Sequence, residues 1–314
     1  MNLTPWRPVW MQCQREFWES RGTFLRTPLW VAAVIAALLV MAMITGNIEL
    51  NMALNELRGA PDKLRQLEDG ADLVGALMSG DLFSSHPQVL RAALVAIAIP
   101  FILTLLLVSQ VYLLGCLYSD RRDKSILFWK SLPVSETRVV LTKLAFGALI
   151  GPGVFLGASL LVGLLHLLML LGYISWQLGV VLPDMGSLIG TFLGHSLALV
   201  SGWLQFSLWF LPLWAWLMLA SAYAKKSPFL VAFGIPAAAM VLELWLLRSV
   251  QLWNAVWVPT HRSFEGLVQA LAEPQAWPGQ WGQTLGTPAF WFGLVVAAGI
   301  TLGAIWLRNN RYEL

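Results

Sequence analysis

The stretch LAFGALIGPGVFLGASLLVGLLHLLMLLG, residues 144–172, contains no Asp, Glu, Lys or Arg. About 20 apolar residues are enough for a helix to cross a hydrocarbon core that is ~30 Å thick. A helix also satisfies its own backbone hydrogen bonds in lipid, where no water is present to do so. This stretch therefore predicts a transmembrane helix, and five further apolar runs have the same character.

The sequence thus predicts an all-α polytopic membrane protein in which a single transmembrane domain covers residues 1–314. Runs longer than the bilayer needs are expected to tilt or to project beyond it. The six predicted spans are about 28–45, 89–118, 142–172, 189–223, 228–247 and 288–307.

The composition supports this class and excludes others. Of the 314 residues, 58% are hydrophobic and 12% are charged, whereas soluble domains average about 45–50% and ~25%. A water-soluble enzyme, a disordered chain and a fibrous chain are excluded. The two cysteines, Cys13 and Cys116, are too few for a disulfide framework.

Residues 1–27 do not form a signal peptide, because they contain four arginines and no apolar core. Apolar and polar residues alternate here with a helical period, which predicts an amphipathic helix lying in the membrane interface. A solvated tail is the alternative. The apolar side holds Trp10, Cys13, Phe17 and Phe24, and the polar side holds Gln12, Arg15, Glu16 and Glu19.

The basic residues predict the orientation. If the N-terminus lies inside, the outer segments contain only six of the 20 basic residues, namely Arg58, Lys63, Arg65, Arg91, Arg248 and Arg262. The other 14 are inside, so both termini are predicted to be cytoplasmic.

Two outer segments are long. Residues 46–88 are acidic with a helical leucine period, which predicts short helices on the outer face; residues 249–287 are rich in Trp, which predicts an interfacial or re-entrant stretch.

The motifs of several enzyme classes are absent. The sequence contains no phosphate-binding G-x-x-x-x-G-K-[ST], no H-E-x-x-H and no G-x-S-x-G. The chain is therefore expected to be no enzyme by itself and to bind no metal, cofactor or nucleic acid.

The inner loop, residues 119–141, combines a charged turn with an apolar face. Residues 126–131 predict a short helix that exposes Ile126, Phe128 and Trp129, and Pro133 ends it. Ser135 is expected to cap the next helix, and Glu136 suits the positive end of that helix. The chemistry fits a docking site for a partner protein and fits equally a turn lying on the inner leaflet.

The run Asp120-Arg-Arg-Asp-Lys-Ser-Ile-Leu-Phe-Trp-Lys-Ser-Leu-Pro-Val-Ser135, with Lys143-Leu144 as the next span begins, resembles one family. Bacterial permease subunits of ATP-binding-cassette exporters of the second type carry a similar D-R-[RK]-x-x-[ST]-x-x-F-[WL]-x-S-L-P-[VI]-S segment after the second of six spans. The resemblance implies that residues 119–141 are the coupling helix of an efflux transporter in the inner membrane. Its implied ATPase contacts are Arg121, Arg122, Lys124, Phe128, Trp129 and Lys130.

The resemblance also implies the partners. Two copies of a separate ATPase subunit would hold ATP and Mg²⁺, and a second permease chain would complete a dimer in the lipid bilayer. The largely uncharged spans favour an apolar or amphipathic substrate. Two alternatives stay open: a membrane immunity or signalling protein, or an intramembrane protease, each without an ATPase partner.

Ionisable groups inside the spans mark a candidate substrate or gate site. His166, His195 and Glu243 each lie about five or six residues from the outer end of a span. Such groups are costly in lipid and often functional. The alternative is that each reaches the interface or bonds a neighbouring helix.

Other polar and irregular positions inside the spans predict helix contacts. Gln110 and Gln205 are expected to bond across helices, and small residues four apart, such as Gly147 and Gly151, predict close packing. Proline inside an apolar run predicts a kink or break. Such prolines are Pro152, Pro212 and Pro236.

Cysteine accessibility tests the predicted orientation. Asp69→Cys and Glu273→Cys should react with an impermeant thiol reagent added outside intact cells, and Lys225→Cys should react only after permeabilisation, because positive charge stays inside. Labelling in the opposite sense would show that the chain is inverted.

Overall fold

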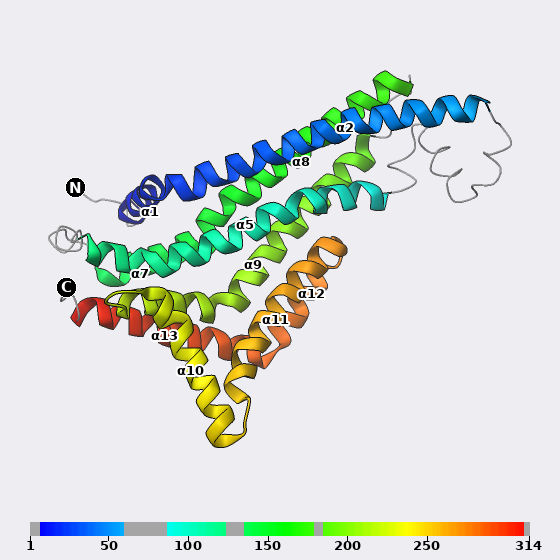
Figure 1. The fold of residues 1–314 in the computed structure, drawn as a ribbon. Helices are drawn as coiled ribbons and strands as arrows, with labels where there is room; N and C mark the ends of the chain where they lie inside the picture. The colour runs from blue at the N-terminus through cyan, green and yellow to red at the C-terminus, as the bar shows by residue number, and fades with distance from the viewer. Residues whose placement is uncertain (1–6, 60–86, 124–134, 179–184, 311–314) are drawn as a thin grey trace. The chain divides into compact units, whose positions relative to one another are not determined.

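The computed structural model describes residues 7–59, 87–123, 135–178 and 185–310, which are helical nearly throughout and contain no strand. Figure 1 shows the helices in chain order. Their bounds are α1 Arg7–Glu19, α2 Thr27–Gly59, α5 Pro87–Arg122, α7 Glu136–Ala145, α8 Gly151–Leu178, α9 Met185–Tyr223, α10 Ile235–Leu242, α11 Gln251–Ala272, α12 Trp277–Gly286 and α13 Pro288–Asn310. Short π-helical turns adjoin them: η1 Gly22–Arg26, η3 Phe146–Ile150, η4 Leu230–Gly234 and η5 Glu243–Leu247.

Six helical segments within the described ranges are long and apolar enough to cross a membrane, which confirms the prediction of an all-α, multi-pass membrane protein. The largest differences from prediction are at the first and third spans, which each begin six residues earlier, at Gly22 and at Glu136; Ser135 caps the helix that opens the third span. The segments are Gly22–Thr45, Leu90–Arg122, Glu136–Tyr173, Gly186–Tyr223, Leu230–Leu247 and Pro288–Asn310.

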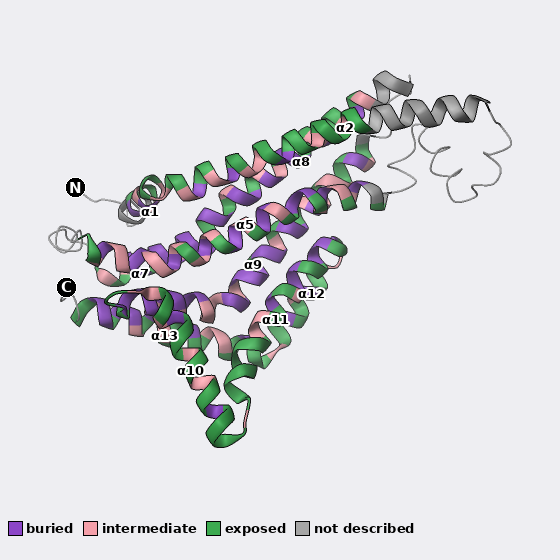
Figure 2. Cartoon of the chain, in the orientation of Figure 1, coloured by how far each residue is buried: buried purple, intermediate pink, exposed green. Residues whose placement is uncertain are grey.

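The chain divides into two compact units, and both are discontinuous in sequence. The first unit contains residues 1–26, 103–155 and 198–314, and the second contains residues 27–102 and 156–197. In the second unit α5, α8 and α9 pack through a small leucine core, to which Phe192 adds a ring. The core residues are Leu90, Leu94, Leu167, Leu171 and Leu188. Helix α2 exposes many apolar side chains, including Trp30 and Leu38, as a lipid-facing helix does (Figure 2).

Aromatic side chains build the core of the first unit. The ring of Phe24 is fully buried and meets Tyr112, Phe146 and Phe155 edge to face. Edge-to-face pairs add to the stabilisation from burial alone. Gly151 lies under the Phe24 ring so closely that any Cβ there would overlap it. The predicted small-residue packing therefore serves a contact within the chain at this position.

Pro152 and Pro236 sit in continuous helices instead of breaking them. Each follows a π-helical turn, and each lacks the N–H that the carbonyl four residues earlier would accept. The carbonyl freed by Pro152 belongs to Ala148. It accepts hydrogen bonds from two α9 side chains, Trp203 Nε1 at 3.2 Å and Ser207 Oγ at 3.1 Å.

The carbonyl freed by Pro236 belongs to Ala232 and also finds a tryptophan of α9. Trp216 Nε1 donates to it at 2.9 Å. A backbone carbonyl in an apolar environment is costly to leave without a partner. The two tryptophans therefore supply side-chain donors beside the two prolines, and the predicted kink at each proline stays a prediction.

The two long outer segments differ from their predictions in part. Residues 46–59 continue α2 and form no separate short helix, whereas residues 60–86 lie outside the described residues. The Trp-rich segment forms α11 and α12, which pack on the middle of α9. Trp281 Nε1 donates to Ser201 Oγ at 2.7 Å, and Gln205 Nε2 donates to Thr284 Oγ1 at 2.5 Å, which confirms the cross-helix bond expected of Gln205.

A double-mutant cycle tests the tryptophan–carbonyl contact. Trp216→Phe should lower the free energy of unfolding by about 1–3 kcal/mol, because it leaves the Ala232 carbonyl buried without a donor. In a Pro236→Ala background the loss should be smaller, since position 236 then carries an N–H. Thermal unfolding in lipid nanodiscs measures both values.

The matched control is Trp245→Phe, at a tryptophan that is 76% exposed, which should change stability little. If Trp216→Phe lowered the free energy of unfolding equally with and without Pro236→Ala, Pro236 would not be the reason that the Ala232 carbonyl needs a donor.

Candidate functional site

The described residues on both sides of the inner loop lead into one buried cluster of charges. On the amino-terminal side, Asp120 lies in the last turn of α5 and is 6% exposed. On the other side, Ser135 caps α7 by accepting a hydrogen bond from the Arg138 N–H, as predicted, and Glu136 opens the helix. Both acidic side chains point to cations that come from other parts of the chain.

Five charged side chains form a chain of alternating sign, which we call the ionic network. Lys143 Nζ lies 3.0 Å from Glu16 Oε1 and 3.5 Å from Asp120 Oδ1. Arg308 Nη1 lies 2.9 Å from the other Asp120 oxygen, Oδ2. Arg308 Nε donates to Glu136 Oε2. The network thus joins α1, α5, α7 and α13 within the first unit.

The ionic network is almost closed to its surroundings. The side chains of Glu16, Lys143 and Arg308 are each 3% exposed. Arg15 adds a third cation, with Nη2 at 2.6 Å from Glu16 Oε1, so three carboxylates face three cations. The Tyr112 hydroxyl donates to Glu16 Oε2 at 2.9 Å. Beside the network, burial raises the pKa of Glu19, and the nearby Arg15 opposes this shift.

The orientation of α1 corrects the prediction made from its amphipathic pattern. Gln12 and Glu16, predicted to lie on its solvated side, are buried against α7. Thr142 Oγ1 donates to Gln12 Oε1 at 3.2 Å, and Glu16 pairs with Lys143. Of the predicted apolar side, Phe24 is buried and Cys13 and Phe17 are half-buried, whereas Glu19 of the polar side is exposed. Gln12 and Glu16 turn inward because a buried ammonium group at Lys143 would be very costly without a counterion.

Arg121, a predicted ATPase contact, uses its guanidinium inside the chain. Its Nη2 donates to the Ser221 carbonyl at 2.7 Å and to the Ala224 carbonyl at 2.8 Å, at the end of α9. Ser221 Oγ in turn accepts from the N–H groups of Leu117 and Tyr118. Arg121 therefore joins the ends of α5 and α9, where helix carbonyls have no partner of their own.

Arg122 is the predicted contact that faces outward, with a side chain 62% exposed. It pairs with Asp123 at 2.9 Å, and this hydrogen bond lowers the pKa of Asp123. The remaining predicted contacts, Lys124, Phe128, Trp129 and Lys130, lie outside the described residues.

The three candidate gate residues are divided between the two units. Glu243 belongs to the first unit, where its carboxylate accepts the N–H groups of Gln251 at 2.7 Å and Leu252 at 2.9 Å. It thereby caps α11 after the tight turn at Arg248, whose φ is +49°. His166 and His195 belong to the second unit, and the Nδ1 atom of each is buried without a hydrogen-bond partner. No group of three His, Cys, Asp or Glu among the described residues is arranged to hold a metal.

The comparisons with known proteins do not assign the site. No protein-family model, no curated protein and no solved structure matches the chain.

Substitution of Lys143 tests the energetic importance of the ionic network. Lys143→Met should destabilise the protein by about 3–5 kcal/mol, because Glu16 and Asp120 lose a buried counterion. Adding Glu16→Gln should recover part of this loss by removing one unpaired charge. Thermal unfolding of the chain in nanodiscs gives the three stabilities.

Arg122→Met is the control, since the pair that it breaks is exposed and is expected to change stability little. Equal effects of Lys143→Met and Arg122→Met would show that the network does not stabilise the fold.

Proposed function

We propose that the chain is the permease subunit of an ATP-driven exporter in a bacterial inner membrane, with both termini in the cytoplasm. In this proposal the inner loop, residues 119–141, receives a separate ATPase subunit. The permease performs no catalysis itself; ATP and Mg²⁺ belong to the ATPase, and two copies of each subunit form the transporter. The cargo is an apolar or amphipathic molecule.

The observation that carries this proposal is that the ionic network holds both ends of the inner loop. Asp120 precedes residues 124–134 and Glu136 follows them, and both carboxylates pair with Arg308. The two ends of the loop are thus tied to the same guanidinium group on α13, although Arg308 is 188 residues from Asp120. A loop anchored in this way can transmit force to the helices.

The ionic network would also transmit force from the inner loop to the helices. A coupling element must be stiff, because slack between the docked partner and the spans would absorb the movement. Lys143 connects the Asp120 end of the loop to Glu16 on α1, and Arg308 connects both ends to α13. Displacement of the loop would therefore act on α1, α7 and α13 together.

The presence of buried ion pairs is better explained by force transmission than by a contribution to stability alone. Replacing such pairs with apolar side chains is often neutral or stabilising, whereas breaking one is costly. The network therefore favours one arrangement of the four helices over sheared alternatives. The resemblance of residues 120–135 to the coupling segment of exporter permeases supports the same assignment.

Truncation of the two aromatic residues in the inner loop tests the docking role. Phe128→Ala with Trp129→Ala should weaken ATPase binding by ~30-fold or more, since buried aromatic anchors typically lose at least about 2 kcal/mol on truncation. The chain should remain inserted in the membrane. Co-purification of the two subunits, ATPase rate and export from proteoliposomes are the measurements.

Two variants serve as controls for this test. Trp245→Ala removes an exposed tryptophan on a different helix and should leave partner binding unchanged. Arg122→Ala should weaken binding mildly and in a salt-dependent way, as expected for a charge at the rim of an interface. Normal co-purification and export by the Phe128 and Trp129 double variant would overturn the proposal.

A further inference from the structure

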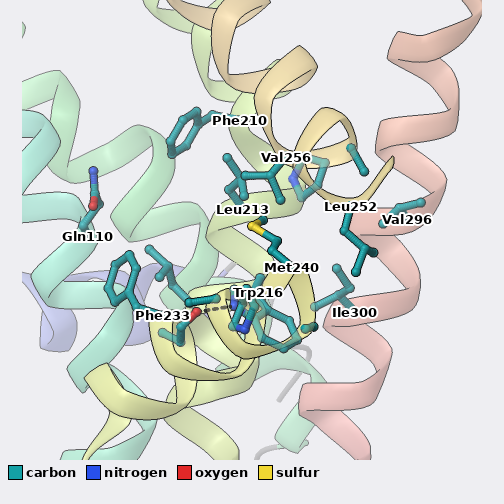
Figure 3. Close-up of a pocket in the computed structure, with 17 residues that line it drawn as sticks. Gln110, Phe210, Leu213, Trp216, Phe233, Met240, Leu252, Val256, Val296 and Ile300 are labelled. Carbon is teal, nitrogen blue, oxygen red and sulfur yellow. Dashed lines mark hydrogen bonds between the residues drawn. The ribbon is translucent and has the colours of Figure 1, made fainter. Parts of the chain in front are cut away.

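The first unit contains an apolar cavity of about 580 Å³ that is open on one side. Its walls come from α9, η4, α10, α11 and α13, and Gln110 of α5 completes the lining. Figure 3 shows Met240, Leu213 and Val256 between the walls, with Gln110 and Ile300 toward opposite ends of the view. The volume falls within the ~300–1,000 Å³ typical of sites for small molecules.

The walls of the cavity are held by contacts that do not depend on an occupant. The hydrogen bond from Trp216 to the Ala232 carbonyl fixes the η4 wall against α9. Glu243 caps the first turn of α11 and so holds that helix beside the end of α10. The cavity is therefore a feature of the folded unit and not a loose gap between helices.

The chemistry of the lining favours an apolar occupant. None of the 17 lining residues has an ionisable side chain. Apart from the Gln110 amide, the polar side-chain group in the wall is the Trp216 indole, whose N–H is already donated to Ala232. A buried water requires two to four polar partners, so a cavity of this size cannot hold an ordered water cluster.

The cavity is open on one side, and wall atoms that face no neighbour lose dispersion contacts. An aliphatic chain restores these contacts without needing hydrogen bonds. A volume of about 580 Å³ leaves room for an aliphatic chain. The wall residue Phe233 is exposed on a segment that is long and apolar enough to cross a membrane, so lipid has access.

We propose that this cavity is a binding site for one acyl chain of a bilayer phospholipid, which remains bound as a structural ligand. The headgroup stays outside, since the lining offers no charge to receive it. The site is distinct from the inner loop and does not depend on an ATPase partner.

Photo-crosslinking tests this site. The chain is reconstituted without any partner in phosphatidylcholine nanodiscs that contain phosphatidylcholine with a diazirine on one acyl chain. Crosslinked peptides mapped by mass spectrometry should come from residues 210–217, 232–240 and 252–256 in excess over the lipid-facing residues of α2. Labelling spread evenly over both surfaces would overturn the proposal.

Matched alanine substitutions separate the cavity from the lipid surface. Ala239 lines the cavity, whereas its neighbour Ala238 is exposed and does not. Ala239→Trp should reduce cavity labelling about tenfold by filling the space, while Ala238→Trp should leave it unchanged. Ala255→Phe, on the α11 wall, should reproduce the loss if Ala239→Trp fails to fold. Unchanged labelling in the folded cavity variants would overturn the proposal.

A second arm distinguishes a resident lipid from transported cargo. The labelling is repeated with the ATPase partner bound, before and after ATP is added. A resident acyl chain gives the same labelling in both conditions, whereas a chain that is lost during ATP hydrolysis is cargo and contradicts the proposal. Failure of the ATPase to bind affects only the exporter assignment, since the first arm uses the chain alone.

Discussion

A buried ammonium group at Lys143 places the strongest single constraint on the first unit. Electrostatic interactions strengthen in a low-dielectric interior, but the loss of hydration costs more unless a counterion is close. Glu16 and Asp120 meet this requirement from two different helices. The same requirement at Arg308 brings in Glu136, so the relative registers of α1, α5, α7 and α13 all follow from the pairing of a few buried charges.

The backbone is subject to the same constraint as the charged side chains. In an apolar environment a carbonyl released by proline has no water to bond, and it must find a donor within the protein. Trp203 and Ser207 supply the donors for Ala148, and Trp216 supplies the donor for Ala232. Helix α9 thus provides partners for two other spans, and its many tryptophans have a structural role beyond the membrane interface.

Helix α13 connects the two regions to which we assign a function. Ile300 lines the apolar cavity, and Arg308 belongs to the ionic network. These residues are eight positions apart, which is about 12 Å along a helix. If the inner loop moves α13 during transport, the cavity wall must move with it, because Val296 and Ile300 lie on the same helix as Arg308. An acyl chain held there would therefore stabilise one position of α13.

The sequence by itself determined the number of spans, their approximate limits and the cap at Ser135. These features depend on the length of apolar runs and on local backbone chemistry, and lipid leaves an apolar run few alternatives to a helix. It also singled out residues 119–141, which connect the second and third spans. Only the tertiary structure decided which way α1 faces, because Glu16 meets a lysine 127 residues away. The donors for the proline-released carbonyls and the cavity walls likewise come from distant segments, and no local pattern encodes which of them meet.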